Sequence, residues 1–237
     1  MRASPAPLLF ALDRNSSMPE KSYADIKRTI YSAVLSDVLD SLGWMNQAMR
    51  PFVRPLMDDS VIMGRARTGL WMNVYSVAAG ENPYEHEIAL LDDLKPGDIA
   101  VFGCGGPTDR IAPWGELLST AAKCRGAEGC VTDGLIRDTM KIRAMEFPVF
   151  HGGIGPLDSR ARAKMVAIDV PIECAGVRVC AGDIVFGDVD GVVVIPGAVT
   201  DEAIALALQK VTSENRTRDE LLQGRLLAEV YAKYGVL

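Results

Sequence analysis

Apolar residues recur at four-residue steps near the start of the chain, over 22–42, and a glycine follows them. This spacing places apolar side chains on one face of a helix, and glycine is common just after a helix ends. The pattern therefore predicts one amphipathic helix over this range. The apolar positions are Ile26, Ile30, Val34, Val38 and Leu42, and the glycine is Gly43.

The rest of the chain alternates between strand-like and helix-like segments. Strands alternating with helices, followed by a strand-rich run, indicate one α/β domain with partly antiparallel sheets and not a doubly wound nucleotide fold. Apolar or alternating segments predict strands at 61–78, 95–103, 128–134, 147–153 and 170–196, the last divided by turns. Amphipathic segments predict helices at 87–94, 115–125, 139–145 and, as one long tail, 200–234.

Two turn sequences resemble each other, "PGDIAVFG" at 96–103 and "AGDIVFGDVDG" at 181–191. Both place Gly-Asp directly before an apolar strand. They are either short repeats of one strand unit or two independent uses of the same turn chemistry. Turn chemistry also accounts for Asp183, Asp188 and Asp190 without a metal ion.

Composition restricts the classes of function. The 237 residues are 49% hydrophobic and 24% charged, with a formal net charge of −6, which argues against a nucleic-acid scaffold. No apolar run is long enough for a membrane span. The five cysteines form no C-x-x-C pair, so we expect free structural thiols and a cytoplasmic location. We expect 1–21 to be a loose extension, with Met18 as an alternative first residue, and 22–237 to be the folded domain.

The candidate chemistry lies at the ends of two predicted elements. Gly115 and Glu116 begin a helix, where unpaired backbone N–H groups favour an anion. Arg137 and Asp138 follow a buried strand. The Arg137 guanidinium suits a carboxylate or enolate oxygen, and the Asp138 and Glu116 carboxylates are hard ligands for Mg²⁺ or Mn²⁺. The residues alone also allow a plainer interpretation, a local Arg137–Asp138 ion pair and a helix-start carboxylate at Glu116.

Around these residues the chain resembles the family that joins the class II 4-hydroxy-4-methyl-2-oxoglutarate/4-carboxy-4-hydroxy-2-oxoadipate aldolases with the regulator of ribonuclease E activity A. The shared pattern is an acidic residue, twenty arbitrary residues, Arg-Asp, two more residues and a basic residue, here Glu116, Arg137, Asp138 and Lys141. "SDVLDSLG", "GRART" and "FPVF" also match, as do the two turn sequences. The resemblance extends from about residue 22 to the C-terminus and is most specific over 114–138.

The resemblance implies a fold and an assembly. The fold would be a single compact α/β domain with mixed sheets in a ββα sandwich of the swivelling type. The chain would assemble as a homotrimer or homohexamer with its sites between subunits, and neither a nucleic acid nor a membrane is expected as a partner.

It also implies roles for individual residues. Asp138 would bind Mg²⁺ or Mn²⁺, and Glu116 would reach the metal directly or through water. A carboxylate from the neighbouring subunit, best matched by Glu214, would complete the site. The substrate's pyruvyl part would be held by Arg137 and by the loop from Gly115 through Glu116 and Leu117 to Leu118.

The implied activity is that of a metal-dependent lyase that cleaves a 4-hydroxy-2-oxo acid to pyruvate and a second oxo acid. Decarboxylation of oxaloacetate would accompany it, because both reactions form the enolate of pyruvate. Catalysis would rest on Arg137, Glu116 and Asp138. Characterised aldolases of the family commonly have Asp at the position of Glu116, so the identity of the oxo acid stays open. The alternative is a non-catalytic regulator that binds a ribonuclease or another protein.

Other catalytic patterns do not fit the sequence. His86 and His151 lie in separate segments, so neither an H-E-x-x-H zinc site nor a Ser-His-Asp relay is expected. The "GCGGP" segment lacks the Lys-Ser/Thr ending of a phosphate-binding loop.

Overall fold

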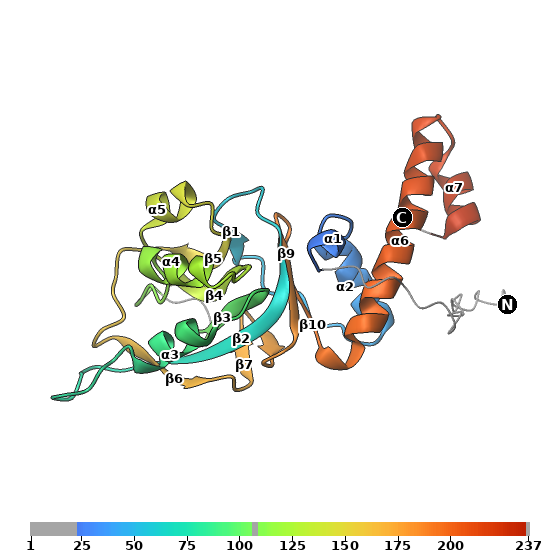
Figure 1. Cartoon of the computed structure of the whole chain (residues 1–237). Coiled ribbons are helices and arrows are strands. Elements are labelled where there is room, and N and C mark those ends of the chain that lie inside the picture. The colour runs from blue at the N-terminus through green and yellow to red at the C-terminus, as the bar shows by residue number, and fades with distance from the viewer. Residues whose placement is uncertain (1–22, 106–108, 236–237) are drawn as a thin grey trace.

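An eight-stranded mixed sheet forms the centre of the computed structural model, which describes residues 23–105 and 109–235 (Figure 1). The strand order is β1-β5-β4-β3-β2-β9-β10, and β6 also pairs with β2. These strands are β1 (Arg54–Pro55), β2 (Ile62–Asn73), β3 (Asp98–Gly103), β4 (Gly129–Ile136), β5 (Val149–Ile154), β6 (Ala163–Ile168), β9 (Ile184–Asp188) and β10 (Gly191–Ile195). A separate hairpin consists of β7 (Ile172–Cys174) and β8 (Val177–Val179).

Strand β2 connects the two halves of the sheet. It is parallel to β3 along one side. Along its other side it pairs antiparallel first with β9 and then, beyond Gly69, with β6. The outer strands β1 and β10 approach each other, since Arg54 Nη1 donates to the Asp190 carbonyl at 2.6 Å and Ala48 bridges Val193. The sheet is therefore nearly closed.

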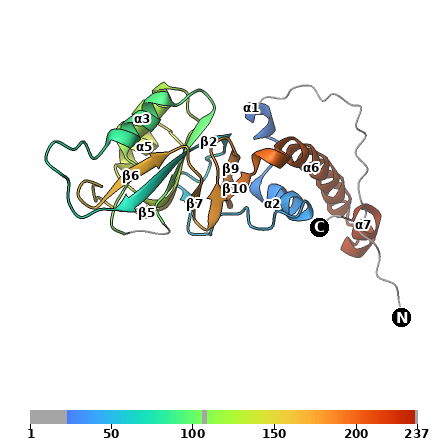
Figure 2. The same ribbon diagram turned by 90° about the horizontal axis from the view of Figure 1, so that it is seen from below.

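Helices cover the sheet in two groups (Figures 1 and 2). The first group lies beside the parallel strands and consists of α3 (Glu85–Asp93), α4 (Glu116–Cys124) and α5 (Thr139–Ala144). The second lies beside β9 and β10 and consists of α1 (Tyr23–Ile26), α2 (Ser32–Ser41) and α6 (Thr200–Leu222). A final helix, α7 (Leu227–Tyr234), folds back on α6, where Lys233 and Tyr234 both donate to Glu220.

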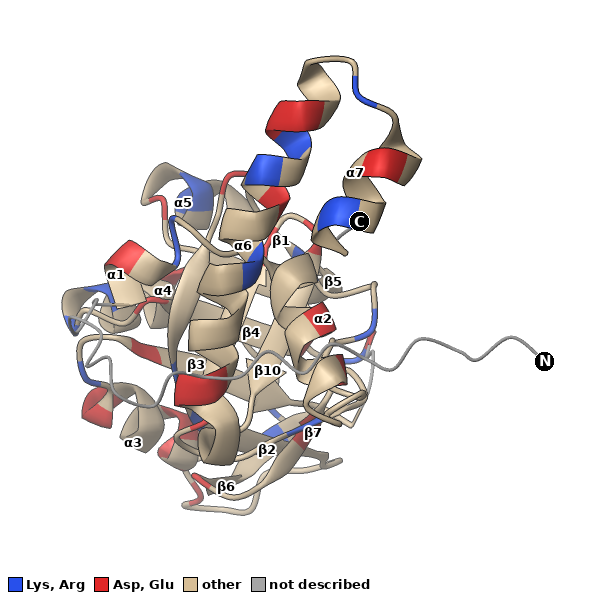
Figure 3. Ribbon diagram, turned by 90° about the vertical axis from the view of Figure 1, so that its right-hand side faces the viewer, with Lys and Arg blue, Asp and Glu red and all other residues tan. Residues whose placement is uncertain are grey.

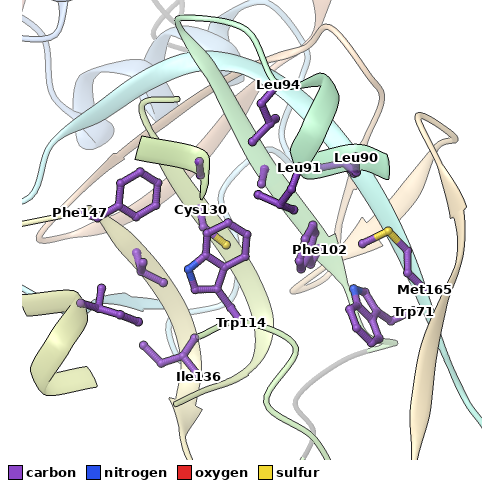
Figure 4. Close-up of a cluster of buried hydrophobic side chains, with 14 of the residues drawn as sticks. Trp71, Leu90, Leu91, Leu94, Phe102, Trp114, Cys130, Ile136, Phe147 and Met165 are labelled. Carbon is purple, nitrogen blue, oxygen red and sulfur yellow. The ribbon is translucent and has the colours of Figure 1, made fainter. Parts of the chain in front are cut away.

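An aromatic cluster fills the space between the sheet and the first group of helices (Figure 4). The Phe102 ring meets Trp114 edge-on, with the ring centres 5.4 Å apart, and Trp114 stacks on Phe147 at 6.2 Å. All three side chains are buried. This packing fixes the segment that contains Trp114, directly before the predicted site.

The second group of helices shows mixed charge. On the face formed by α6, α2 and α1, acidic and basic residues lie close together (Figure 3). Lys210 of α6 pairs with Asp37 of α2 there. In the parts that the structure describes, no helix is long and apolar enough to cross a lipid bilayer.

The single mixed α/β domain predicted from the sequence is confirmed, and two of the predicted helices are corrected. The helix predicted over 22–42 is two helices, because Tyr31 is extended (φ −145°, ψ 164°) and α2 begins afresh at Ser32. The tail predicted as one segment over 200–234 turns back near Gly224, which has a φ of +81°. Strands β1 and β6 were not predicted, and the extension expected over 1–21 lies outside the described residues.

The two Gly-Asp turns have the same geometry. The Lys95 and Cys180 N–H groups each donate to the Asp three residues later, Asp98 or Asp183, and both bonds measure 2.8 Å. The intervening glycines have φ values of +85° and +89°. Such a turn needs a left-handed residue at this position, so glycine is favoured there. The turn role expected of Asp183 is confirmed.

Asp188 also caps the start of α2, although it lies 156 residues away from Ser32 in sequence. Its carboxylate accepts from the Ser32 N–H at 2.8 Å and from the Ser32 hydroxyl at 2.7 Å. We predict that Asp188→Asn lowers the free energy of unfolding by about 1–2 kcal/mol, because it weakens a buried cap at a helix start. Urea denaturation measures this loss, and the exposed Asp190→Asn is the control. Equal stability of the two variants would contradict the cap.

Candidate active site

The end of β4 and the start of α4 are held side by side. Trp114 forms a parallel bridge with Ile136, and the Arg137 N–H donates to the Trp114 carbonyl at 3.0 Å. The chain then turns into α4 after Gly115 and into α5 after Asp138. The two parts of the motif, twenty residues apart in sequence, are therefore neighbours in the structure.

Gly115 leaves room for the Asp138 and Arg137 side chains to lie close to the backbone at the start of α4. A Cβ atom at this position would lie 2.8 Å from Asp138 Oδ2 and 3.1 Å from Arg137 Cγ. The Glu116 N–H donates to the same Asp138 oxygen at 3.3 Å. The absence of a side chain at Gly115 thus lets the Asp138 carboxylate reach the first turn of α4.

Asp138 has an unusual backbone conformation. Its φ of 57° and ψ of 30° lie in the left-handed region, which is uncommon outside glycine and is tolerated best by Asn and Asp. Such strain persists only where the surrounding structure enforces it, and it is often found at functional sites. The Asp138 side chain is 44% exposed, so its carboxylate is accessible to a ligand.

Arg137 lies between two carboxylates. Its Nε is 3.7 Å from Asp138 Oδ2, and its Nη1 is 3.0 Å from Asp158 Oδ1. Asp158 also accepts from the Tyr84 hydroxyl at 2.7 Å and from the Arg160 N–H at 3.1 Å. Burial alone would raise the pKa of Asp158, but these hydrogen bonds and the charge of Arg137 outweigh it and hold the pKa below its usual value.

Glu87 is a buried carboxyl near this pair. It lies in the first turn of α3, is only 8% exposed, and its Oε2 has no hydrogen-bond partner. Burial, reinforced by the negative charge of Asp158 and partly opposed by Arg137, raises its pKa to about 8. Among the groups near Arg137, Glu87 therefore differs from Asp158 in being uncharged at neutral pH.

Sequence reasoning missed Glu87, Asp158 and Tyr84. Glu87 did carry a signal, because it occupies the same helical stripe as Leu90, Leu91 and Leu94, whose side chains are all buried. A carboxylate at a core position of an amphipathic helix requires an explanation. Asp158 lies in an irregular segment before β6, where sequence gives no comparable signal.

Glu116 faces Lys141. Glu116 Oε2 is 3.8 Å from Lys141 Nζ, and its Oε1 accepts from the Thr120 hydroxyl at 3.3 Å. In the structure Lys141 contacts Glu116 from the first turn of α5, with 71% of its side chain exposed.

A hollow of about 470 Å³ opens beside these groups. It is lined by Arg137, Asp138, Ile154, Gly155 and Pro156. Three large apolar side chains near it are well exposed, Leu117 on α4, Met140 on α5 and Ile154 at the end of β5. Exposed apolar groups around a charged hollow are typical of a surface that another molecule covers.

Glu214 lies apart from this cluster within its own chain. It is on α6, which packs against α2, and it accepts a hydrogen bond from Tyr31. Arg137 and Asp138 lie beside α4 and α5 on the other side of the molecule (Figure 1). Glu214 could therefore reach such a site only in a neighbouring subunit, as the resemblance implies.

Several other polar residues serve the fold. Asp133, at which the apolar run of β4 ends, is fully buried and accepts from the Cys104 and Ala175 N–H groups at 2.7 and 3.1 Å. Burial lowers the pKa of His151 to about 4 and keeps it neutral at physiological pH. All five cysteines are free.

The donor set fits a divalent metal with open coordination positions. In the described parts of the chain, no three His, Cys, Asp or Glu side chains gather closely enough to hold a metal ion on their own. Mg²⁺ usually keeps several waters and takes only one or two protein carboxylates together with substrate oxygens. Asp138 and Glu116 supply such carboxylates, and Gly115 leaves the space beside Asp138 Oδ2 open.

The fold and this cluster define a class: a mixed α/β protein whose nearly closed sheet has charged residues gathered at the end of a parallel strand. Residues 32–194 match the profile of the RraA-like family (Aldolase/RraA), and the chain belongs to that family. The resemblance carried by 114–138 is thereby confirmed.

Relatives within the family have different names. A Halalkalibacterium halodurans protein provisionally named 4-hydroxy-4-methyl-2-oxoglutarate aldolase is 32% identical over 204 residues, which is 85% of this chain and 89% of that protein. The 4-hydroxy-4-methyl-2-oxoglutarate aldolase of Thermus thermophilus is 31% identical over 107 residues, 45% of this chain and 64% of that protein.

A solved structure represents the family members that are named as inhibitors of an RNase. It is RraAS2 of Streptomyces coelicolor, described as an unusual member of the RNase ES inhibitor RraA family. It is 26% identical and covers 85% of this chain and 99% of its own, with a TM-score of 0.72. The family thus includes proteins named as aldolases and proteins named as inhibitors of an RNase.

Proposed function

We propose that the protein is a divalent-metal-dependent lyase that cleaves a 4-hydroxy-2-oxo acid, of the 4-hydroxy-4-methyl-2-oxoglutarate or 4-carboxy-4-hydroxy-2-oxoadipate type, to pyruvate and a second oxo acid. Oxaloacetate decarboxylation would use the same site. The observation that carries the proposal is the contact of Arg137 and Asp138 with the glycine-led start of α4. Arg137 and Asp138 line an accessible hollow, and the contact brings the first N–H group of α4 to the Asp138 carboxylate.

The binding of the 2-oxo acid follows from these groups. Arg137 donates charge-assisted hydrogen bonds to the substrate carboxylate or its 2-oxo oxygen. The N–H groups of Leu117 and Leu118 belong to the first turn of α4, where backbone donors have no partner within the helix and favour an anion. Asp158 pairs with the Arg137 guanidinium and is itself held by the Tyr84 hydroxyl. These contacts orient the guanidinium before substrate binds.

Bond cleavage requires one proton acceptor and one charge stabiliser. Glu116, directly or through water, accepts the proton of the 4-hydroxyl group as the C3–C4 bond breaks. The bonding electrons move to the 2-oxo oxygen, where Arg137 stabilises the growing negative charge. A proton returned to C3 then gives pyruvate. Asp138 and Glu116 would hold Mg²⁺ or Mn²⁺, which supplies Lewis-acid stabilisation of that oxygen when bound.

The exposed apolar groups support a site between subunits. Leu117, Met140 and Ile154 would be covered by a second copy in a homotrimer or homohexamer, and that copy would contribute its Glu214. The same surface favours the second candidate function, a regulator that binds a ribonuclease or another protein, because a protein partner would also cover apolar side chains. The name of the Streptomyces coelicolor relative adds to this alternative.

Removing the metal tests the first proposal. We expect purified protein to release pyruvate from oxaloacetate and from 4-carboxy-4-hydroxy-2-oxoadipate with Mg²⁺, and to lose this activity with a chelator, because the Arg137 charge alone cannot replace a Lewis acid. The oligomeric state, measured by light scattering, should not change. Turnover that persists with the chelator would exclude metal dependence, and metal binding without turnover of either acid would favour the regulator.

A further inference from the structure

Glu87 is a buried acid that neither the family motif nor the proposed reaction uses. We propose that it is a positioning residue: buried without a hydrogen-bond partner beside Arg137 and Asp158, it stays an uncharged carboxylic acid at neutral pH and thereby leaves Arg137 free to bind an anionic substrate. The substrate part of this inference rests on the proposed function, whereas the effect on Arg137 does not.

The geometry favours the uncharged form. An ionised carboxylate needs hydrogen-bond donors or water, and burial without them is costly. Glu87 Oε2 is enclosed and no group of the described chain donates to it, while Leu90 and Leu91 continue the same helical stripe into the core. Tyr84, the residue just before α3, gives its hydroxyl hydrogen to Asp158.

The charges that face Glu87 come from three segments. Asp158 precedes β6 and acts against ionisation, Arg137 ends β4 and acts in favour of it, and Tyr84 begins α3. Arg160 does not act on Glu87 directly. Its charge lowers the pKa of Tyr84, and its backbone N–H donates to Asp158. Asp138 also faces Arg137, with its Oδ2 3.7 Å from the Arg137 Nε, so Asp158 and Asp138 already share this guanidinium. With Glu87 protonated, no third negative charge is added to them.

Ionisation of Glu87 would change this balance. A third carboxylate would then act on the one guanidinium of Arg137, and one further negative charge would lie near the place where the substrate carboxylate must bind. Repulsion of this kind reduces affinity for an anion more than it changes the chemical step. A rise in pH through the Glu87 pKa of about 8 should therefore raise KM for the oxo acid and leave kcat nearly constant.

Nuclear magnetic resonance tests the inference without any substrate. In ¹³C-Glu,¹⁵N-Arg-labelled full-length protein, the Glu87 carboxyl signal, assigned by its loss in Glu87→Gln, should titrate near pH 8. The Arg137 Nε signal should move at the same pH in the wild type and in Glu85→Gln, an exposed acid of the same helix, but not in Glu87→Gln. Titration of Glu87 near its ordinary value, or an Arg137 signal that ignores it, would overturn the proposal.

Thermal stability supplies a second readout. The pKa of Glu87 is higher in the folded chain than its ordinary 4.5, so unfolding releases a proton between pH 4.5 and about 8. The stability that protonated Glu87 contributes is therefore fully present below pH 4.5, decreases as the pH rises, and is lost above about pH 8. We expect the Tm of the wild type to fall across this range relative to Glu87→Gln and Glu87→Leu. Parallel Tm profiles would contradict a raised pKa.

Kinetics complete the test. For 4-carboxy-4-hydroxy-2-oxoadipate we expect KM to rise about tenfold as Glu87 ionises, and this rise should disappear in Glu87→Gln. An unchanged pH profile in the variant would overturn the positioning role. If no oxo acid is turned over while the resonance result holds, the proposed function fails and the coupling of Glu87 to Arg137 stands.

Discussion

Asp138→Asn should lower kcat/KM for the oxo-acid substrate by at least about 100-fold, because the substitution removes the charge of the proposed metal ligand beside Arg137. Asn is the informative replacement. It tolerates the left-handed backbone at this position, whereas Ala would add strain to the loss of charge. Initial rates of pyruvate release over a range of Mg²⁺ concentrations measure the effect and show whether added metal restores turnover.

Asp169→Asn is a matched control for that variant. Asp169 also has a positive φ, 53°, and pairs with an arginine, Arg67, outside the candidate site. Its replacement should leave turnover unchanged. Full activity in Asp138→Asn, with Tm near that of the wild type, would exclude Asp138 as a required ligand.

Gly115→Ala is expected to reduce kcat/KM by about 10- to 100-fold, since a displacement of catalytic groups by as little as 1 Å can cost this much. The backbone of Gly115 is extended (φ −156°, ψ −170°), so alanine fits it without strain. The new methyl group, however, would lie 2.8 Å from Asp138 Oδ2 and would push the carboxylate away from α4. Steady-state kinetics together with Tm separate this displacement from unfolding.

Gly197→Ala provides the comparison for that substitution. A Cβ at Gly197 would meet only Asp183 Oδ1, at an ordinary 3.8 Å, so the variant should match the wild type in activity. If Gly115→Ala were equally active, the close approach of Asp138 to the start of α4 would have no part in catalysis.

The sequence predicted those parts of the site that depend on local chemistry. Gly115 and Glu116 at a helix start, and Arg137 with Asp138 after a buried strand, were recognisable because residue type and element boundary coincide. Asp158 was not, because its role depends on a contact with Arg137, which lies 21 positions earlier in the chain, before α5 and β5. Glu87 was overlooked because a single polar residue hardly weakens a helical pattern. Its position on the same face as buried leucines nevertheless identifies it as an unusual buried acid.

The fold shows the same division. Local periodicity located most helices and strands, but it continued through Tyr31, where the chain breaks between α1 and α2. That break depends on Asp188, which lies 156 residues away from Ser32 in sequence and caps α2 there. Strand β6 escaped prediction because its register is set by β2, opposite an irregularity between Leu70 and Trp71.

The central position of β2 in the sheet affects how the protein unfolds. It is paired on one side with β3 and on the other with β9 and β6, so both halves of the sheet depend on this one strand. Displacement of β2 would break the backbone pairing of both halves. The amide hydrogens of β2 should thus be among the last to exchange with solvent, and the protein should unfold as one cooperative unit.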